Sequence, residues 1–165
     1  MKTLGPLVLS SALLICIFKG PAYGVDALRY WVGAHACQSS SIQVSDRILS
    51  SSKQETDRIR SILRFVISNL NEFGGPIHSK EMKLVDQYLL HCLAKYFQNI
   101  SRFYDNMQFN QVCIRTQNFV ANDVSGFYLS IVKDRLYCEE KASLKRQSAV
   151  TTLYWIGIIM TKLLR

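Results

Sequence analysis

The sequence contains little proline and no segment in which apolar and polar residues alternate over the length of a strand. Its prolines are Pro6, Pro21 and Pro76, so most of the chain can form long helices without a helix-breaking residue. Without period-two alternation, a half-buried β-sheet is not predicted. No internal repeat or low-complexity tract is present either. These absences favour an all-α fold.

The sequence also lacks the residue pairs from which metal sites and disulfide frameworks are built. Its five cysteines are Cys16, Cys37, Cys92, Cys113 and Cys138. No two of them form the C-x-x-C pair that is common in zinc sites. None of the three histidines has a histidine or a carboxylate four residues away, as a helical metal site or a catalytic pair would need. We therefore expect no metal in this protein.

The first 18 residues form an apolar segment that is set apart from the rest of the chain. A lysine at position 2, an apolar run from Leu7 to Phe18 and the small residues Ala22 and Gly24 are typical of a secretory signal. The run is shorter than the roughly 20 residues that cross a bilayer, so a membrane partner is not expected. Residues 1–18 are predicted to be either signal-like or a spurious start.

Charge points to a polyanionic partner. The chain has 20 Lys and Arg residues against 12 Asp and Glu, a net charge of +8. Without the first 24 residues the charge is still +6, from 18 basic and 12 acidic residues, so the excess belongs to the folded part. Nucleic acid is the commonest partner of a basic surface, although a soluble, slightly basic domain without such a partner has the same composition.

Helical periodicity predicts a bundle of about five to six helices over residues 19–165. The predicted helices are Ala27–Ala36, Ser51–Leu70, Ser79–Met107, Asn110–Val120, Asp123–Leu136 and one from Ser143 to the chain end. Asp26, Ser79 and Asp123 are predicted to cap the helices that follow them.

Apolar residues are predicted to face the core of this bundle. The buried stripe of the second helix is predicted to contain Ile59, Ile62, Leu63, Val66 and Leu70. The aromatic residues of the third helix, assigned to packing rather than to base stacking, are Tyr88, Tyr96, Phe97, Phe103 and Tyr104. The last helix is apolar nearly all round and has no end signal, so we expect the parent sequence to continue beyond it.

Four segments carry a resemblance to a known family. Residues 23–32 follow the pattern Y-G-x-D-x-L-R-x-W, and residues 57–65 are similar to K-I-R-N-T-x-R-F. Residues 86–90 (DQYLL) fit the start of a long helix, and residues 127–138 contain F-Y-x-x-x-x-K-D-R-L-Y. In this order and spacing the segments resemble the anticodon-binding region of isoleucyl-tRNA synthetases, which are class I aminoacyl-tRNA synthetases, and the mitochondrial form in particular.

The resemblance implies that residues 19–165 form a helical anticodon-binding domain, truncated at its C-terminal end. Isoleucine tRNA and the catalytic domain of a parent enzyme are the implied partners, with ATP and magnesium as cofactors of that parent. The chain contains neither the His-x-Gly-His nor the Lys-Met-Ser-Lys-Ser signature of the family. We therefore expect no catalytic residue, no cofactor and no aminoacylation by this chain alone. Ser61 and Ile62 replace an Asn-Thr pair of the family, so no polar contact of that pair is carried over.

Two sets of charged residues are candidate functional groups. The candidates for binding tRNA phosphates are Arg58, Arg60, Arg64, Lys141, Lys145 and Arg146. Guanidinium groups suit this role because they donate paired, charge-assisted hydrogen bonds to phosphate, although a solvated helix face has the same appearance. The candidates for a structural charge network between domains are Lys133, Asp134 and Arg135, which lie within an apolar helix.

Two other functions remain open at this point. The signal-like start, the bundle and a glycosylation sequon at residues 99–101 fit a secreted or membrane-associated binding protein of the four-helix type. A non-functional relic of a synthetase has the same fold as the working module. By resemblance, the expected location is the mitochondrial matrix or the cytoplasm.

Overall fold

The computed structural model describes residues 23–36, 44–70 and 73–164. Across these ranges the chain is helical and contains no strand, which confirms the all-α prediction. The apolar segment 1–18 lies outside the described residues, so the prediction made for it stays a prediction.

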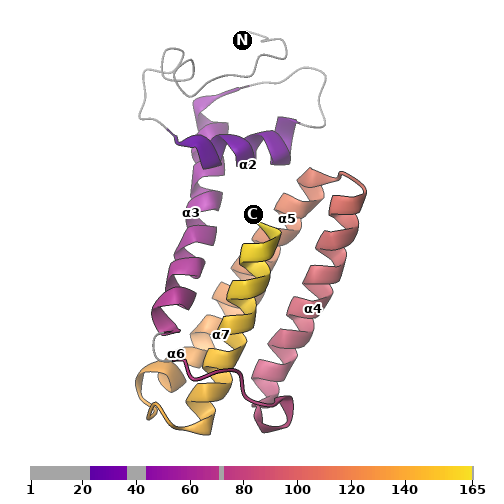
Figure 1. The fold of residues 1–165 in the computed structure, drawn as a ribbon. Helices are drawn as coiled ribbons and strands as arrows, with labels where there is room; N and C mark the ends of the chain where they lie inside the picture. Colours follow the sequence, from indigo (N-terminus) through magenta and orange to yellow (C-terminus); the bar gives the residue numbers. More distant parts are fainter. Residues whose placement is uncertain (1–22, 37–43, 71–72, 165) are drawn as a thin grey trace.

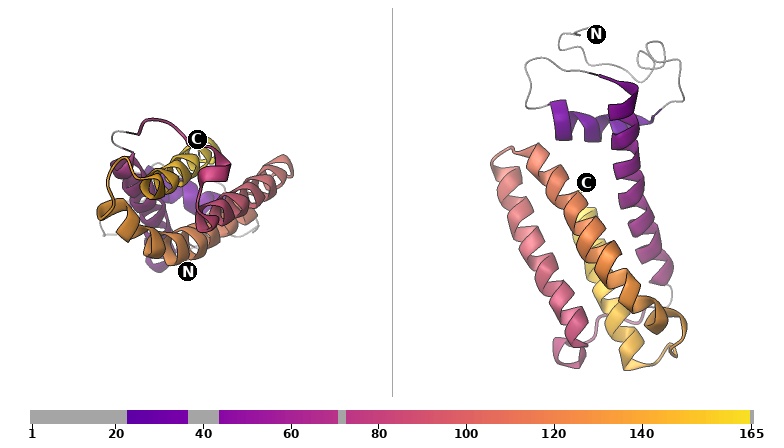
Figure 2. Two further views of the ribbon diagram at one scale, coloured as in Figure 1. Left: turned by 90° about the horizontal axis from the view of Figure 1, so that it is seen from below. Right: turned by 180° about the vertical axis from the view of Figure 1, so that it is seen from behind.

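The described chain forms a bundle of long helices with one shorter helix lying across it (Figure 1). The elements are α2 (Val25–His35), α3 (Asp46–Asn69), a 3₁₀ turn η2 (Ser79–Glu81), α4 (Leu84–Asp105), α5 (Phe109–Asn118), a π-helical stretch η3 (Phe119–Tyr128), α6 (Leu129–Tyr137) and α7 (Leu144–Leu163). The segments α5, η3 and α6 make one continuous rod, which Figure 2 shows from behind. Along the chain, α3, α4, this rod and α7 alternate in direction, and α2 crosses the upper part of α3.

One hydrophobic core runs through the bundle, and a small second one joins α2 to α3. In the large core, buried side chains of α3, α4, the rod and α7 pack together; the largest that are fully buried include Tyr128, Leu89, Leu93, Ile100, Leu153, Ile156 and Met160. The second core is centred on Trp31 of α2 and Leu49 of α3. Burial of such side chains contributes about 1.5–3 kcal/mol each, so helix packing is the main source of stability.

Helix α3 confirms its predicted stripe but begins earlier than expected. Ile59, Ile62 and Val66 are buried and Leu63 is half-buried. The helix starts at Asp46 rather than Ser51, because the side chain of Ser45 accepts a hydrogen bond from the backbone N–H of Ile48, at 3.4 Å. A capping oxygen of this kind satisfies one of the donors that a helix start leaves unpaired.

All three predicted caps were wrong. Asp26 lies inside the first turn of α2, and Gly24, with φ of 88°, takes the cap position. Ser79 belongs to the short turn η2, and α4 begins only at Leu84, because the preceding backbone is held elsewhere: the N–H of Lys83 donates to Ser148 of α7 at 3.0 Å. Tertiary contacts override local capping preference at this site.

The predicted break at Asp123 is also absent, since this residue lies within the π-helical stretch η3. The stretch buries Phe119, Val120, Val124 and Tyr128, and this burial keeps the chain helical where the Asn-Asp pair suggested an end. π-helical turns are uncommon and cannot be predicted from apolar periodicity based on 3.6 residues per turn.

The apolar stripe of α4 is narrower than predicted. Leu89, Leu93 and Tyr96 are buried as expected, but Tyr88 and Phe97 are 54% and 42% exposed, which corrects their assignment to the core. The helix packs mainly on α5, η3 and α7. In α7, Trp155 is likewise 40% exposed, whereas Ile156 and Met160 are fully buried.

Candidate nucleic-acid interface

The three candidate arginines of α3 do not form one patch. All three are exposed. Arg60 and Arg64 lie one helical turn apart on the same side, whereas Arg58 is roughly 200° around the helix axis from Arg60. A single stretch of RNA backbone therefore meets either Arg58 or the Arg60–Arg64 side, not all three at once.

Arg60 already has protein partners. Its guanidinium forms an ion pair with Asp26 of α2 and a longer one with Asp57, at 3.5 Å. Asp26 also meets Arg29, at 3.5 Å. These side chains are at least half exposed, so each pair contributes at most about 1 kcal/mol, and Arg60 can exchange a carboxylate for a phosphate at low cost.

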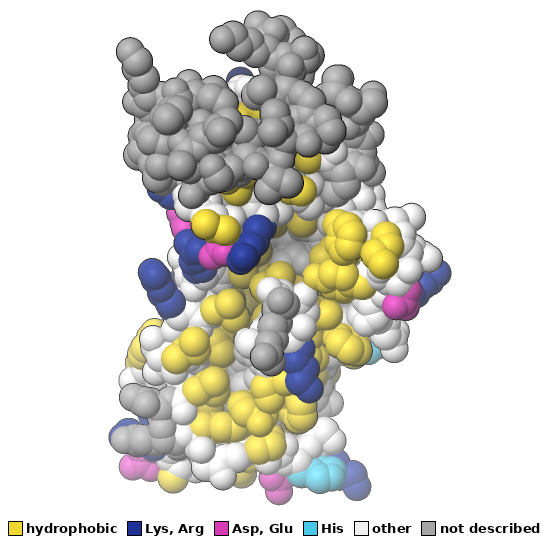
Figure 3. Space-filling model, turned by 45° about the horizontal axis from the view of Figure 1, so that its top comes forward, with side chains coloured by type: hydrophobic (Ala, Val, Ile, Leu, Met, Phe, Trp, Pro, Cys, Tyr) yellow, Lys and Arg dark blue, Asp and Glu magenta, His cyan; other side chains and the backbone are white. Residues whose placement is uncertain are grey.

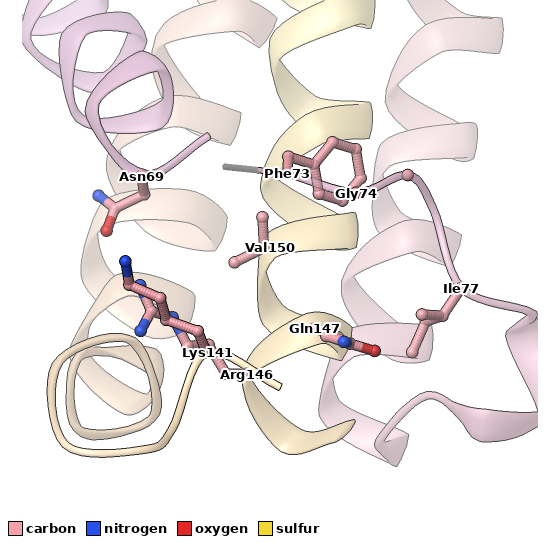
Figure 4. Close-up of a pocket in the computed structure, with 9 residues that line it drawn as sticks. Asn69, Phe73, Gly74, Ile77, Lys141, Arg146, Gln147 and Val150 are labelled. Atoms are coloured by element: carbon pink, nitrogen blue, oxygen red, sulfur yellow. The ribbon is translucent and has the colours of Figure 1, made fainter. Parts of the chain in front are cut away.

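The connection between α6 and α7 helps to form a cavity of about 280 Å³ at the lower end of the bundle. The lining residues are Asn69, Phe73, Gly74, Gly75, Ile77, Lys141, Arg146, Gln147 and Val150. Figure 4 shows the side chains of Lys141 and Arg146 next to each other, extending toward Asn69 at the end of α3. The structure thus brings two of the predicted basic residues to one hollow.

The loop after α3 closes another side of this cavity. Gly75 has φ of 121°, a conformation that other residues rarely adopt, and an added Cβ at either Gly74 or Gly75 would meet no atom within 4 Å. The N–H of Ile77 donates to the hydroxyl of Thr151 on α7 at 3.2 Å, which ties the loop to the bundle. The loop thus lines the hollow at two residues that carry no side chain.

Lys145 does not share this arrangement, although it is adjacent to Arg146 in sequence. Its ammonium lies 3.0 Å from Glu139 Oε1, and the hydroxyl of Ser143 donates to Glu139 Oε2 at 3.1 Å. The hydrogen bonds from Lys145 and Ser143 lower the pKa of the Glu139 carboxyl. Of the three basic residues predicted here, Lys141 and Arg146 line the cavity and Lys145 lies outside it.

Arg135 takes part in a buried charge network, and its partner Asp86 was not identified from the sequence. Nη1 and Nη2 of Arg135 donate to Asp86 Oδ2 and Oδ1 at 2.8 and 3.0 Å. The Tyr128 hydroxyl donates to Asp86 Oδ1 at 2.8 Å, and the hydroxyl of Ser148 donates to Oδ2. Asp86 is 0% exposed, so each of its oxygens is satisfied by two donors in place of water.

This network links α4, η3, α6 and α7 at the lower end of the bundle. Burial and the charge of Asp86 raise the pKa of the Tyr128 hydroxyl, which keeps it a hydrogen-bond donor at all physiological pH values. Asp86 and Arg135 belong to the DQYLL and K-D-R-L-Y segments, so the ion pair joins two of the motifs that carried the resemblance. Lys133 and Asp134 are exposed and form no ion pair within the described chain; their role between domains stays a prediction.

A second hollow is apolar and lies between α3 and α7. It measures about 390 Å³ and is lined by Leu63, Val66, Ile67, Leu70, Tyr154, Gly157, Ile158, Thr161 and Lys162. Figure 3 shows apolar side chains spread over one face of the bundle, with basic side chains at intervals along it.

Within the described ranges, no group of three His, Cys, Asp or Glu residues is placed to hold a metal ion. No helix there is long and apolar enough to cross a membrane.

Comparison with known proteins gives a consistent result. Residues 86–165, which span α4 to α7, match the model of the anticodon-binding domain of tRNA ligase. The chain is 36% identical over 138 residues to the mitochondrial isoleucine–tRNA ligase of Gallus gallus. The aligned region covers 82% of this chain and 14% of that protein. It is 37% identical over 145 residues to the isoleucine–tRNA ligase of Petrotoga mobilis, covering 86% of this chain and 16% of that protein. The chain thus spans about one seventh of the length of these relatives. These matches do not favour the alternative of a secreted four-helix protein.

Proposed function

We propose, from the match of residues 86–165 to the anticodon-binding domain of tRNA ligase, that this chain is the helical tRNA-binding part of an isoleucine–tRNA ligase. The observation that carries the proposal is the family match, which begins at Asp86 and covers every helix from α4 onward. The basic charge of the folded part, +6, supports a polyanionic ligand.

The tRNA would be bound mainly through its phosphates. Contacts of this kind position a nucleic acid without reading its sequence, and they weaken steeply with salt. Arg58, Arg64 and the cavity residues Lys141 and Arg146 are the basic groups best placed for them, with Arg60 able to join after leaving Asp26. Selectivity for isoleucine tRNA is proposed from the relatives whose names carry that amino acid.

The parent enzyme would supply the chemistry. A catalytic domain that binds ATP and magnesium is the proposed partner, and the mitochondrion or the cytoplasm is the proposed location. For the chain alone we expect no isoleucine-dependent exchange of pyrophosphate into ATP, since it lacks both ATP-binding signatures. Measurable exchange by the purified chain would contradict this assignment.

The test is binding of an isoleucine tRNA transcript to the full chain, followed by gel shift at several salt concentrations. We expect a complex whose logarithmic affinity falls linearly with the logarithm of salt concentration. Circular dichroism on the same sample checks that the chain is folded. A folded chain that retains no tRNA at low salt would overturn the proposal, and an aggregated or molten chain would support the non-functional relic.

A further inference from the structure

The apolar hollow between α3 and α7 is a groove whose floor is a close contact between the two helices. The helices run in opposite directions (Figure 1), and a Cβ added to Gly157 of α7 would lie 3.0 Å from Val66 Cγ1 of α3. Gly157 therefore lets the two backbones approach closely. Along α3 the groove is lined from Leu63 to Leu70, a length of about 10 Å or two helical turns.

The walls of this groove are mostly aliphatic and partly open to water. Ile67 of α3 is 69% exposed, and Ile158 of α7 is half-buried. Aliphatic side chains around a hollow of about 390 Å³ favour an apolar occupant. They offer few hydrogen bonds to the edge of an RNA base, since the hydroxyl of Thr161 already donates to the Gly157 carbonyl at 2.7 Å. The walls therefore suit protein side chains better than a nucleotide.

Charge around the groove has one sign. Lys162 lines the groove on the upper side of Gly157, and Arg64 lies three residues from Ile67, on the same side of α3. Neither cation forms an ion pair within the described residues. Helix α7 contains no Asp or Glu, and α3 contains none after Asp57. An occupant with carboxylates at the upper end complements this charge.

We propose that this groove receives one amphipathic helix from the catalytic part of the parent ligase. The helix packs its apolar side chains between Ile67 and Ile158. Its acidic last turn, together with the negative end of its dipole, meets Arg64 and Lys162. Two turns of helix match the length of the groove and present apolar residues at i, i+4 and i+7. The inference rests on the proposed function, which makes the catalytic part the partner, and it reassigns Arg64 from the tRNA to that partner.

Other occupants of the groove fit the charge less well. Residues 1–18 of this chain are apolar, but they contain Lys2 and no Asp or Glu. A second copy that docked by the same face would bring two basic surfaces together, which repel each other. The chain spans only 14% and 16% of two relatives, so most of the polypeptide of a parent ligase lies outside it. That polypeptide is the source we assign to the docking helix.

Synthetic peptides test the chemistry of the groove in the full chain. The probe is a helical peptide with leucines at i, i+4 and i+7 and glutamates in its last turn, and its control has lysines in place of the glutamates. Each is titrated into ¹⁵N-labelled chain and followed by NMR. We expect the acidic peptide to shift the amides of Ile67, Gly157 and Ile158 and to bind about fivefold tighter than the control. Equal affinities, or shifts that centre elsewhere, would overturn the proposal.

Two matched pairs of variants locate the contact. Ile67→Ser changes an exposed wall of the groove, and Ile114→Ser changes an isoleucine of α5 that is 48% exposed and lies outside it. We expect the acidic peptide to bind about tenfold more weakly to Ile67→Ser and less than about twofold more weakly to Ile114→Ser. Arg64→Gln should weaken binding about threefold, whereas Arg47→Gln, in the first turn of α3, should not change it. Equal effects within either pair would contradict the assigned contacts.

A further experiment tests the source of the helix. The Gallus gallus ligase, expressed without its aligned region, is mixed with the full chain, and association is measured by analytical ultracentrifugation. We expect association that Ile67→Ser weakens about tenfold and Ile114→Ser leaves unchanged. Absence of association would remove the assignment to the parent ligase. Self-association of the chain that is lost in Ile67→Ser would assign the groove to a second copy instead, and tRNA retention lost in Ile67→Ser would assign it to RNA.

The tRNA gel shift, run on the same variants, separates this inference from the proposed function. A chain that retains tRNA but associates equally well as Ile67→Ser and as Ile114→Ser would overturn the inference alone. A chain whose association depends on Ile67 but which retains no tRNA would overturn the tRNA-binding function and leave the docking groove in place.

Discussion

Two junctions of the bundle each carry an ion pair between segments far apart in the sequence, and they differ in their access to water. At the lower end, Arg135 of α6 holds Asp86 of α4, whose side chain is 0% exposed. Where α2 crosses α3, Arg60 meets Asp26, and these side chains are 50% and 54% exposed. Salt and water weaken an exposed pair, whereas breaking a buried pair leaves a charge with no solvent to stabilise it. The buried pair therefore fixes the fold, and the exposed pair leaves Arg60 free to exchange partners.

The largest expected effect tests the buried side of this comparison. Asp86→Ala removes the carboxylate and leaves the half-buried guanidinium of Arg135 without its partner, so we expect a loss of about 3–5 kcal/mol in the free energy of unfolding. Urea unfolding followed by circular dichroism measures the change. A loss below about 1 kcal/mol would contradict the structural role given to this pair.

Within the same network, Tyr128→Phe tests a single hydrogen bond. It removes the donor 2.8 Å from Asp86 Oδ1 and keeps the buried ring, so we expect a loss of about 1–2 kcal/mol in the same measurement. Tyr137→Phe is the control, because that side chain is 66% exposed. Similar losses for the two variants would show that the hydroxyl of Tyr128 does not support Asp86.

The exposed side of the comparison predicts a smaller effect on stability. Asp26→Asn breaks the contacts to Arg60 and Arg29, and we expect the free energy of unfolding to change by less than about 1 kcal/mol. Since the variant also releases Arg60, tRNA affinity should rise slightly. A stability loss as large as that of Asp86→Ala would remove the distinction between the two junctions.

The smallest effect concerns pH at the exposed Glu139–Lys145 pair. The pKa of Glu139 is lowered in the folded state, so its contribution to stability is present above the unfolded pKa near 4.5 and is lost as pH falls through the folded value. NMR titration of the Glu139 carboxyl should report this lowered pKa, and Lys145→Gln should raise it toward the ordinary range. An unchanged pKa in Lys145→Gln would mean that Lys145 is not the main cause.

The sequence was sufficient for the features that depend on one helix at a time. Period-3.6 spacing identified the buried face of α3 at Ile59, Ile62 and Val66, and the absence of alternation excluded strands. Features that depend on contacts between distant segments could not be predicted from the sequence. Nothing in the order Lys145-Arg146 indicates that Lys145 pairs with the carboxylate of Glu139 while Arg146 donates to its backbone carbonyl and lines a cavity with Gly74 and Gly75.

Asp86 illustrates the same limit from the other side. From the sequence it was assigned no role beyond its place at the start of the DQYLL segment. Its burial depends on Arg135 and Ser148, which are 49 and 62 residues away along the chain. The one available signal was indirect: the motifs that contain Asp86 and Arg135 both carried the family resemblance.

The π-helical stretch η3 determines the direction around the rod axis in which the side chains of α6 point. In an uninterrupted α-helix, Val132 would lie about 160° around the axis from Thr116, on nearly the opposite side of the rod. Both residues are nevertheless buried, and both belong to the same rod. The wider turns of η3 change the rotation per residue, so that the buried side chains of α5 and those of α6 face the same core. Arg135 follows this stretch in the rod and reaches Asp86, so the buried ion pair at the lower end depends on the helical geometry of the ten residues immediately before α6.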